Sequence, residues 1–236
     1  MTHSEWISAT SPLFKIPFSL CASGPSGCGK SFWVKNLLLH PQLYCEGRWN
    51  RVFYFSRFHL PSLEKELIHL PIEFFEGETL PSLQELRGRS VAGEQVLVVI
   101  DDMMEQAAAS PHIRSLFTEG RHIQHSIILT SQNLFHPGKY AVAMRQNTTY
   151  MLLFESMMDR QQIRSFFQRQ RPLRWKELLA FYDLAVSQPY GYLLIDRRSA
   201  LLRYRASIGP VAQMIFTLDP PSKIPTQPNL PNFREL

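Results

Sequence analysis

The residues best suited to chemistry form a glycine-rich loop between an apolar run and a leucine-rich stretch. The loop reads Gly24-Pro25-Ser26-Gly27-Cys28-Gly29-Lys30-Ser31 and satisfies the pattern GxxxxGK[ST]. Glycines let successive backbone N–H groups point inward around phosphate groups, where a side chain would block the approach. In this pattern the lysine reaches the β- and γ-phosphates, and the next hydroxyl binds Mg²⁺. We therefore predict an ATP-binding loop, with Lys30 on the phosphates and Ser31 on the metal.

An acidic pair follows the most apolar run of the sequence, Val96–Ile100. Because a strand covered on both faces loses its polar alternation, this run predicts a central strand that ends at Asp101. A carboxylate there can hold a metal-bound water beside Ser31, so Asp101 is the second predicted Mg²⁺ residue. Asp102 is the predicted catalytic carboxylate that orients the attacking water, with Glu105 in reserve. The alternative for Asp102 is a helix N-cap.

Two further candidates flank the next apolar run, Ser126–Thr130. Gln132 follows the end of this predicted strand, and its amide can donate to one group while accepting from another. It is therefore our candidate for contacting the γ-phosphate and the water together, with a turn built on Asn133 as the alternative. Arg121 precedes the strand and is a candidate for the mobile positive charge that stabilises the γ-phosphate, with an ordinary surface arginine as the alternative.

Short apolar runs alternate with helix-like stretches, which predicts a parallel sheet with crossover helices. The expected strands are Phe18–Ala22, Val52–Ser56, Val96–Ile100, Ser126–Thr130, Met151–Phe154, and a hairpin of Tyr192–Ile195 and Leu201–Arg205. The expected helices are Lys30–Leu39, Ser62–His69, one through Ile113–Phe117, Asp159–Gln170 and Leu173–Val186. The predicted fold class is α/β, a P-loop NTPase of the additional-strand type, with a mostly parallel sheet flanked by helices and a small C-terminal β-hairpin extension.

The length of 236 residues fits one α/β domain with a modest extension. We expect an N-terminal arm at 1–15, a P-loop ATPase core at 16–158, and a basic helical segment with the hairpin packed on the core at 159–208. Residues 209–236 are expected to form a Pro-rich extended tail, because DPPSKIPTQPNLPN has five prolines in fourteen residues.

The net charge of +5 is concentrated in one segment. Residues 160–205 contain ten Lys and Arg against three Asp and Glu, whereas residues 1–159 contain 13 against 15. Such a segment is the footprint expected for binding a polyanion, and a solvated basic face is the alternative. The candidates for contacting the backbone of double-stranded DNA without reading its sequence are the hairpin arginines Arg197, Arg198, Arg203 and Arg205.

Cysteine usage and hydropathy indicate the cellular compartment. Cys21, Cys28 and Cys45 form no CxxC pair, which argues against a disulfide framework and favours an intracellular, reducing environment. Cys28, inside the loop, is expected to be a small packing residue rather than a nucleophile. No apolar run approaches the roughly 20 residues of a membrane span, and the N-terminal residues lack a secretory pattern, so we expect no membrane partner.

Together, the motifs GPSGCGKS, VLVVIDD and SQN, with an arginine before the last strand, resemble the FtsK–HerA superfamily of DNA-translocating ATPases. Within it, the chain is similar to the small genome-packaging ATPases of double-stranded DNA viruses, those of adenoviruses and Polinton-type elements. The likeness covers residues 16–208 and includes DRQQI at 159–163 and the terminal stretch GYLLIDRRSALLRYRASI. One departure is Asp102, where the family commonly has Glu.

This resemblance implies an ATP-hydrolysing motor that forms a homo-oligomeric ring around DNA and moves a viral genome into a capsid. It implies that Arg121 acts in trans, on the nucleotide of the neighbouring subunit. It also implies capsid or portal proteins as partners, and the host-cell nucleus or the virion as the location.

Two other functions stay open on the sequence alone. A nucleotide kinase is compatible with the loop, because Arg160 and Arg164 can form a phosphate lid. A non-hydrolysing, ATP-dependent DNA-binding or assembly factor is compatible with the shorter carboxylate of Asp102. A GTPase is disfavoured by the absence of an NKxD or TKxD motif, and a transport-type ATPase by the absence of an LSGGQ-like segment.

Overall fold

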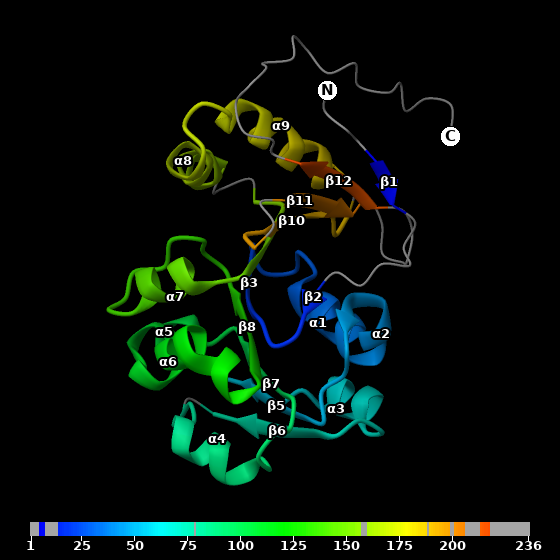
Figure 1. The fold of residues 1–236 in the computed structure, drawn as a ribbon, viewed down its shortest axis with the longest axis vertical. Coiled ribbons are helices and arrows are strands. Elements are labelled where there is room, and N and C mark those ends of the chain that lie inside the picture. Colours follow the sequence, from blue (N-terminus) through cyan, green and yellow to red (C-terminus); the bar gives the residue numbers. More distant parts are fainter. Residues whose placement is uncertain are drawn as a thin grey trace.

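A ten-stranded sheet organises the chain, with the strand order β1-β12-β11-β10-β9-β3-β8-β7-β5-β6 (Figure 1). The computed structural model describes residues 5–7, 14–77, 79–156, 160–187, 189–198, 201–205 and 213–217. A second, small sheet pairs β2 (Phe14–Lys15) with β4 (Cys45–Glu46) in parallel.

Six neighbouring strands of the large sheet are parallel. They are β3 (Ser19–Ser23), β5 (Arg51–Ser56), β6 (Ile72–Glu76), β7 (Val96–Asp101), β8 (His125–Ser131) and β9 (Tyr150–Phe154). Strands β7 and β8 are buried at every position, as expected for strands covered on both faces. Strand β8 lies between β3 and β7, which confirms the additional-strand arrangement. The chain therefore changes direction across the sheet after β3 and leaves a crevice at the carboxyl ends of the strands.

Four antiparallel strands extend the sheet beyond β9: β10 (Tyr192–Asp196), β11 (Leu201–Arg205), β12 (Gln213–Thr217) and β1 (Glu5–Ile7). The predicted hairpin is confirmed, because β10 and β11 pair along their whole length. Strand β10 also pairs with β9, so the hairpin continues the main sheet. Strand β12 lies within the stretch predicted as a tail, whose other residues are outside the described ranges.

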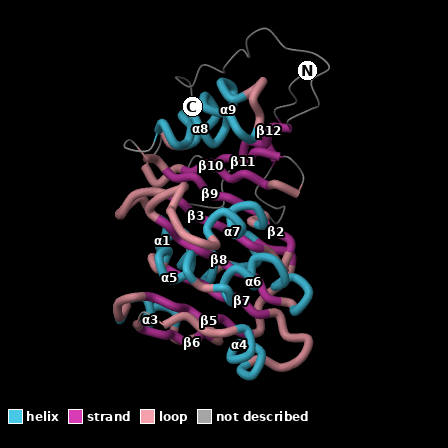
Figure 2. The backbone as a smooth tube through the Cα atoms, turned by 90° about the vertical axis from the view of Figure 1, so that its left-hand side faces the viewer, coloured by secondary structure: helices cyan, strands magenta, loops and turns pink. Residues whose placement is uncertain are grey.

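Helices cover both faces of the sheet (Figures 1 and 2). One face bears α1 (Lys30–Leu39), α2 (Pro41–Tyr44) and α3 (Pro61–Leu67). The opposite face bears α4 (Leu83–Arg89), α5 (Met104–Ala109), α6 (Pro111–Glu119), the 3₁₀ turn η1 (Gly120–Ile123), α7 (Ala141–Asn147), α8 (Arg160–Gln170) and α9 (Trp175–Ala185). None of the helices in the described ranges combines the length and the apolar character that a membrane crossing needs.

The predicted strands and helices are all present, and the elements missing from the prediction are short ones. Strand β6 and helices α4, α5 and α7 have at most seven residues and were not predicted. A signal for α4 was available, because Ser82 and Glu85 form a capping box: each side chain accepts a hydrogen bond from the other residue's backbone N–H. Short helices depend on such caps and on packing rather than on periodicity.

An aromatic cluster joins the start of the chain to the core. Phe14 lies within the predicted arm 1–15, yet its side chain is fully buried. Its ring centroid lies 5.2 Å from that of Phe18, 6.0 Å from Trp33 and 4.7 Å from Tyr150. Because Trp33 belongs to α1, this cluster also fixes the helix that follows the glycine-rich loop.

Candidate nucleotide-binding site

Strand β3 delivers the glycine-rich loop to the carboxyl edge of the sheet, and α1 begins inside it. Gly27 and Gly29 have φ angles of 77° and 104°, which side-chain-bearing residues rarely adopt. Gly29 is the N-cap of α1 and provides no side-chain cap, so the first N–H groups of the helix stay available to an anion. The local backbone therefore has the form of a phosphate cradle.

Lys30 folds back onto this loop. Its side chain is buried, and Nζ donates hydrogen bonds to the carbonyl oxygens of Gly24 at 2.6 Å and Pro25 at 2.8 Å. Phosphate oxygens are stronger acceptors than neutral carbonyls because charge assists the bond. Lys30 is thus positioned beside the cradle, with acceptors that a phosphate can replace.

Cys28 is a packing residue, as its position in the loop predicts. Its side chain is half-buried and packs against the core cluster that contains Val34 and Phe154. Burial raises the pKa of its thiol above the ordinary value, although the Lys30 ammonium 3.8 Å away opposes the shift. A thiol with a raised pKa holds its proton and is a poor nucleophile.

Asp101 is the centre of a network of three hydroxyl groups. Ser31 donates to its Oδ2 at 2.9 Å, Tyr54 to the same oxygen at 2.7 Å, and Thr130 to Oδ1 at 2.6 Å. Asp101 itself is buried. The adjoining Ser31 hydroxyl and Asp101 carboxylate fit Mg²⁺, which prefers hard oxygen ligands and takes few of them from the protein. The two predicted metal residues are therefore brought together.

Sequence reasoning missed Tyr54 and Thr130. Both lie inside apolar runs, VFYFS and SIILT, where a hydroxyl is read as part of the core. Burial raises the pKa of Tyr54 well above its ordinary value, and the neighbouring Asp101 carboxylate raises it further. Tyr54 therefore stays protonated and donates. The available signal was a polar side chain near the carboxyl end of a strand that neighbours the acidic pair.

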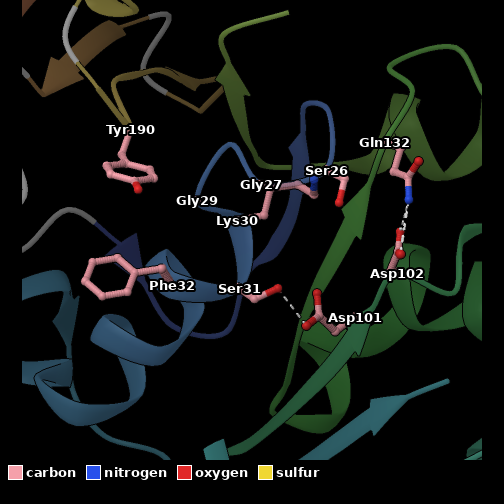
Figure 3. A pocket seen from close by; sticks show the side chains of 10 residues that line it. All are labelled: Ser26, Gly27, Gly29, Lys30, Ser31, Phe32, Asp101, Asp102, Gln132 and Tyr190. Carbon is pink, nitrogen blue, oxygen red and sulfur yellow. Dashed lines mark hydrogen bonds between the residues drawn. The ribbon is translucent and has the colours of Figure 1, made fainter. Parts of the chain in front are cut away.

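Asp102 and Gln132 contact one another across the ends of β7 and β8 (Figure 3). The amide Nε2 of Gln132 donates to both carboxylate oxygens of Asp102, at 3.1 Å each. Both side chains are exposed, and the Asp102 N–H donates to Thr130 Oγ1 at 2.9 Å. The residue after Asp102, Met103, is the N-cap of α5, so the N-cap alternative for Asp102 is wrong.

The turn after β8 is closed by Ser131 rather than by the side chain of Asn133. Ser131 Oγ donates to the Asn133 carbonyl at 2.8 Å and accepts from the Asn133 N–H at 3.2 Å. Gln132, between them, is left free to point toward Asp102.

A cavity of about 400 Å³ joins these features. Its lining consists of loop residues, the acidic pair, Gln132 and two aromatic residues: Ser26, Gly27, Gly29, Lys30, Ser31, Phe32, Asp101, Asp102, Gln132 and Tyr190 (Figure 3). An adjacent cavity of about 260 Å³ shares Asp102 and Gln132 and is also lined by Glu105. Glu105, the second candidate for the catalytic carboxylate, therefore lines a cavity together with Asp102.

Arg121 lies in η1, before the amino end of β8, and is exposed. Gln132 follows the carboxyl end of the same seven-residue strand. A strand of that length spans about 20 Å, so Arg121 lies at the opposite edge of the sheet from its own subunit's cavity.

Two of the four predicted DNA-binding arginines bind backbone carbonyls. Arg197 donates to the carbonyls of Arg145, Gln146 and Thr148 at the end of α7, at 2.6, 3.1 and 3.0 Å. Arg198 donates to the carbonyl of Pro17 at 2.8 Å and lies over the ring of Tyr150.

The other two candidates, Arg203 and Arg205, lie on β11, opposite Leu194 and Tyr192 of β10. They occupy alternate positions of the strand.

One protein family matches part of the chain. Residues 78–187 match the family described as Poxvirus A32 protein, which confirms the predicted resemblance to viral DNA-packaging ATPases over this part of the chain. The matched segment includes the acidic pair, Arg121, Gln132 and helices α8 and α9. No curated protein matches the sequence.

Solved structures confirm the fold. The genome packaging NTPase B204 of Sulfolobus turreted icosahedral virus 2, in complex with ATPγS, has a TM-score of 0.50 and 14% identity, covering 81% of this chain and 98% of that one. Its complex with AMPPCP has a TM-score of 0.51 and 13% identity, with the same coverage. The chain therefore shares the fold of that NTPase.

The catalytic carboxylate can be identified by comparing Asp102→Asn with Glu105→Gln. We expect Asp102→Asn to bind ATP normally but to hydrolyse it about 10²–10⁴-fold more slowly, because the amide keeps the shape of the site and removes the base. Glu105→Gln should hydrolyse at nearly the wild-type rate. Lys30→Ala is the control that loses both nucleotide binding and turnover.

Steady-state phosphate release and calorimetric ATP titration measure the two properties separately. A wild-type rate for Asp102→Asn, together with a slow Glu105→Gln variant, would transfer the catalytic role to Glu105.

Proposed function

We propose that this chain is an ATP-hydrolysing motor that translocates double-stranded DNA and packages a viral genome into a capsid. The observation that supports hydrolysis most directly is the Asp102–Gln132 pair beside the cavity that also contains Lys30, Ser31 and Asp101. The A32 family match and the B204 fold support the packaging role.

The residues of the site divide the chemistry between them. Lys30 and the loop N–H groups bind the phosphates, and Ser31 with Asp101 would hold Mg²⁺. When bound, Mg²⁺ neutralises charge on the β- and γ-phosphate oxygens. Asp102 orients a water molecule toward the γ-phosphorus and accepts its proton. Gln132 fixes the Asp102 carboxylate through Nε2 and leaves its Oε1 free to accept from that water.

The kinase alternative loses its support. Arg160, half of the suggested lid, pairs with Asp183 at 2.6 Å. Arg164 lies over the ring of Trp175, 4.7 Å from its centroid. Neither lines the described cavity beside the loop. A polar pair suited to aligning water also favours hydrolysis over the non-hydrolysing factor.

Duplex DNA should stimulate ATP turnover, since a motor couples hydrolysis to movement along its track. The measurement is phosphate release with and without duplex DNA, with Lys30→Ala as the inactive control. Turnover that needs a small hydroxyl acceptor would identify a kinase, and binding of ATP without turnover in either condition would identify an assembly factor.

Arg121 is proposed to act in trans in a homo-oligomeric ring, because it lies far from its own cavity and is exposed. Arg121→Ala should then lower turnover by about 10³–10⁵-fold, the contribution of arginine fingers elsewhere. Mixing Arg121→Ala with Lys30→Ala subunits should partly restore activity, because each supplies the group that the other lacks.

The matched control is Arg48→Ala, which removes another exposed arginine. It should keep wild-type turnover and should not complement Lys30→Ala. Absence of rescue, with wild-type activity that does not depend on protein concentration, would exclude a role in trans.

The basic segment is proposed to bind the DNA backbone through the hairpin arginines Arg197, Arg198, Arg203 and Arg205. Because Arg197 and Arg198 also bind carbonyls that join α7 and the start of β3 to the sheet, replacing them would disturb the fold. Arg203 and Arg205 give the cleaner test. Removing one arginine that binds a phosphate should reduce the log–log salt slope of DNA affinity by about 0.9, so Arg203→Gln with Arg205→Gln should flatten it by nearly two units.

Arg48→Gln with Lys65→Gln is the charge-matched control, since both side chains are exposed and lie elsewhere in the fold. It should leave the slope unchanged. An Arg203, Arg205 double variant with wild-type affinity and slope would assign this strand to another partner, and capsid or portal proteins are the next candidates.

A further inference from the structure

Two exposed aromatic rings line the loop cavity at the end away from Asp102 and Gln132 (Figure 3). Phe32 is 41% exposed and Tyr190 is 53% exposed. Their ring centroids are 6.5 Å apart, with an angle of 34° between the planes. The proposed catalytic chemistry uses neither ring.

Phe32 is fixed by the helix that binds the phosphates. It follows Ser31 directly, in the first turn of α1. The Lys35 ammonium lies 5.0 Å from its ring centroid and forms an ion pair with Glu66 at 2.7 Å. A cation close to the ring stabilises this orientation. Phe32 therefore has a defined position next to the metal-binding hydroxyl.

Tyr190 reaches the same place from the loop between α9 and β10. Its ring lies against the loop backbone, because a Cβ added at Gly29 would be 2.9 Å from Tyr190 Cδ1. Tyr190 also has a φ of 60°, in the left-handed region that bulky residues rarely occupy. Such strained residues cluster at ligand clamps and active sites, where the surrounding structure maintains them.

We propose that Phe32 and Tyr190 form an aromatic clamp for the base of the bound nucleotide. A planar ring stacked between two others needs about 7 Å between their planes, twice the usual carbon–carbon contact distance. The ring centroids are 6.5 Å apart and the planes are inclined by 34°, so the rings must become more nearly parallel and separate slightly to admit the base. The clamp rests on the proposed function, because it assumes that the triphosphate occupies the adjoining loop.

Stacking gives the clamp a property that the phosphate site does not share. The rings contact the base alone, whereas Lys30, Ser31 and Asp101 contact the phosphates and the metal. Removing a ring should weaken the binding of ATP and leave the binding of inorganic tripolyphosphate unchanged.

The experiment compares Phe32→Ala and Tyr190→Ala with the conservative variants Phe32→Tyr and Tyr190→Phe. Calorimetry measures the Kd of ATP and of tripolyphosphate, each with Mg²⁺. We expect each alanine variant to weaken ATP binding on the order of tenfold or more, as for removal of a base–aromatic stack. The Kd of tripolyphosphate should not change, and both conservative variants should bind ATP like the wild type.

Three results would overturn the clamp. Unchanged ATP affinity would show that the rings do not touch the base, and a shift in oligomeric state alone would assign them to a subunit interface. Equal loss of ATP and tripolyphosphate binding would show that they only support the loop. These titrations measure binding without turnover. The clamp can therefore be tested even if DNA fails to stimulate hydrolysis, and the two failures can be told apart.

Discussion

The site depends on one buried carboxylate. Asp101 would be costly to bury as an anion without partners, and three hydroxyls satisfy it: Ser31 from α1, Tyr54 from β5 and Thr130 from β8. Each bond joins a different element to the end of β7. The glycine-rich loop, the acidic pair and the strand that precedes Gln132 are therefore fixed relative to one another by the same group.

The residues proposed for hydrolysis and those proposed for base binding lie at opposite ends of one cavity. The exposed pair Asp102 and Gln132 lies at one end, where water can enter, and the rings of Phe32 and Tyr190 lie at the other. Between them are the loop and Lys30. A nucleotide bound with its base between the rings would direct its terminal phosphate toward the carboxylate. In the proposed arrangement, hydrolysis and base binding depend on different residues.

The basic segment shows why charge counts describe a surface poorly. Its ten Lys and Arg suggest a surface for a polyanion. Arg197 nevertheless binds the carbonyls at the end of α7, and Arg198 binds those before β3. A guanidinium has five donors, so a residue counted as a DNA contact can equally complete the hydrogen bonds of a helix end. Arg203 and Arg205, on β11, stay predictions from the sequence.

The phosphate loop, the acidic pair and the long strands could be predicted without coordinates, because they depend on local spacing, glycine conformation and apolar runs. Gln132 could also be placed near the site, since parallel strands end at the same edge. Folding in three dimensions was needed to show that Tyr54 and Thr130 bind Asp101, that Arg121 lies far from its own cavity, and that Tyr190 faces Phe32. Residues 32 and 190 are brought together by strand order, and no local pattern encodes which strands become neighbours or how far a side chain reaches across them.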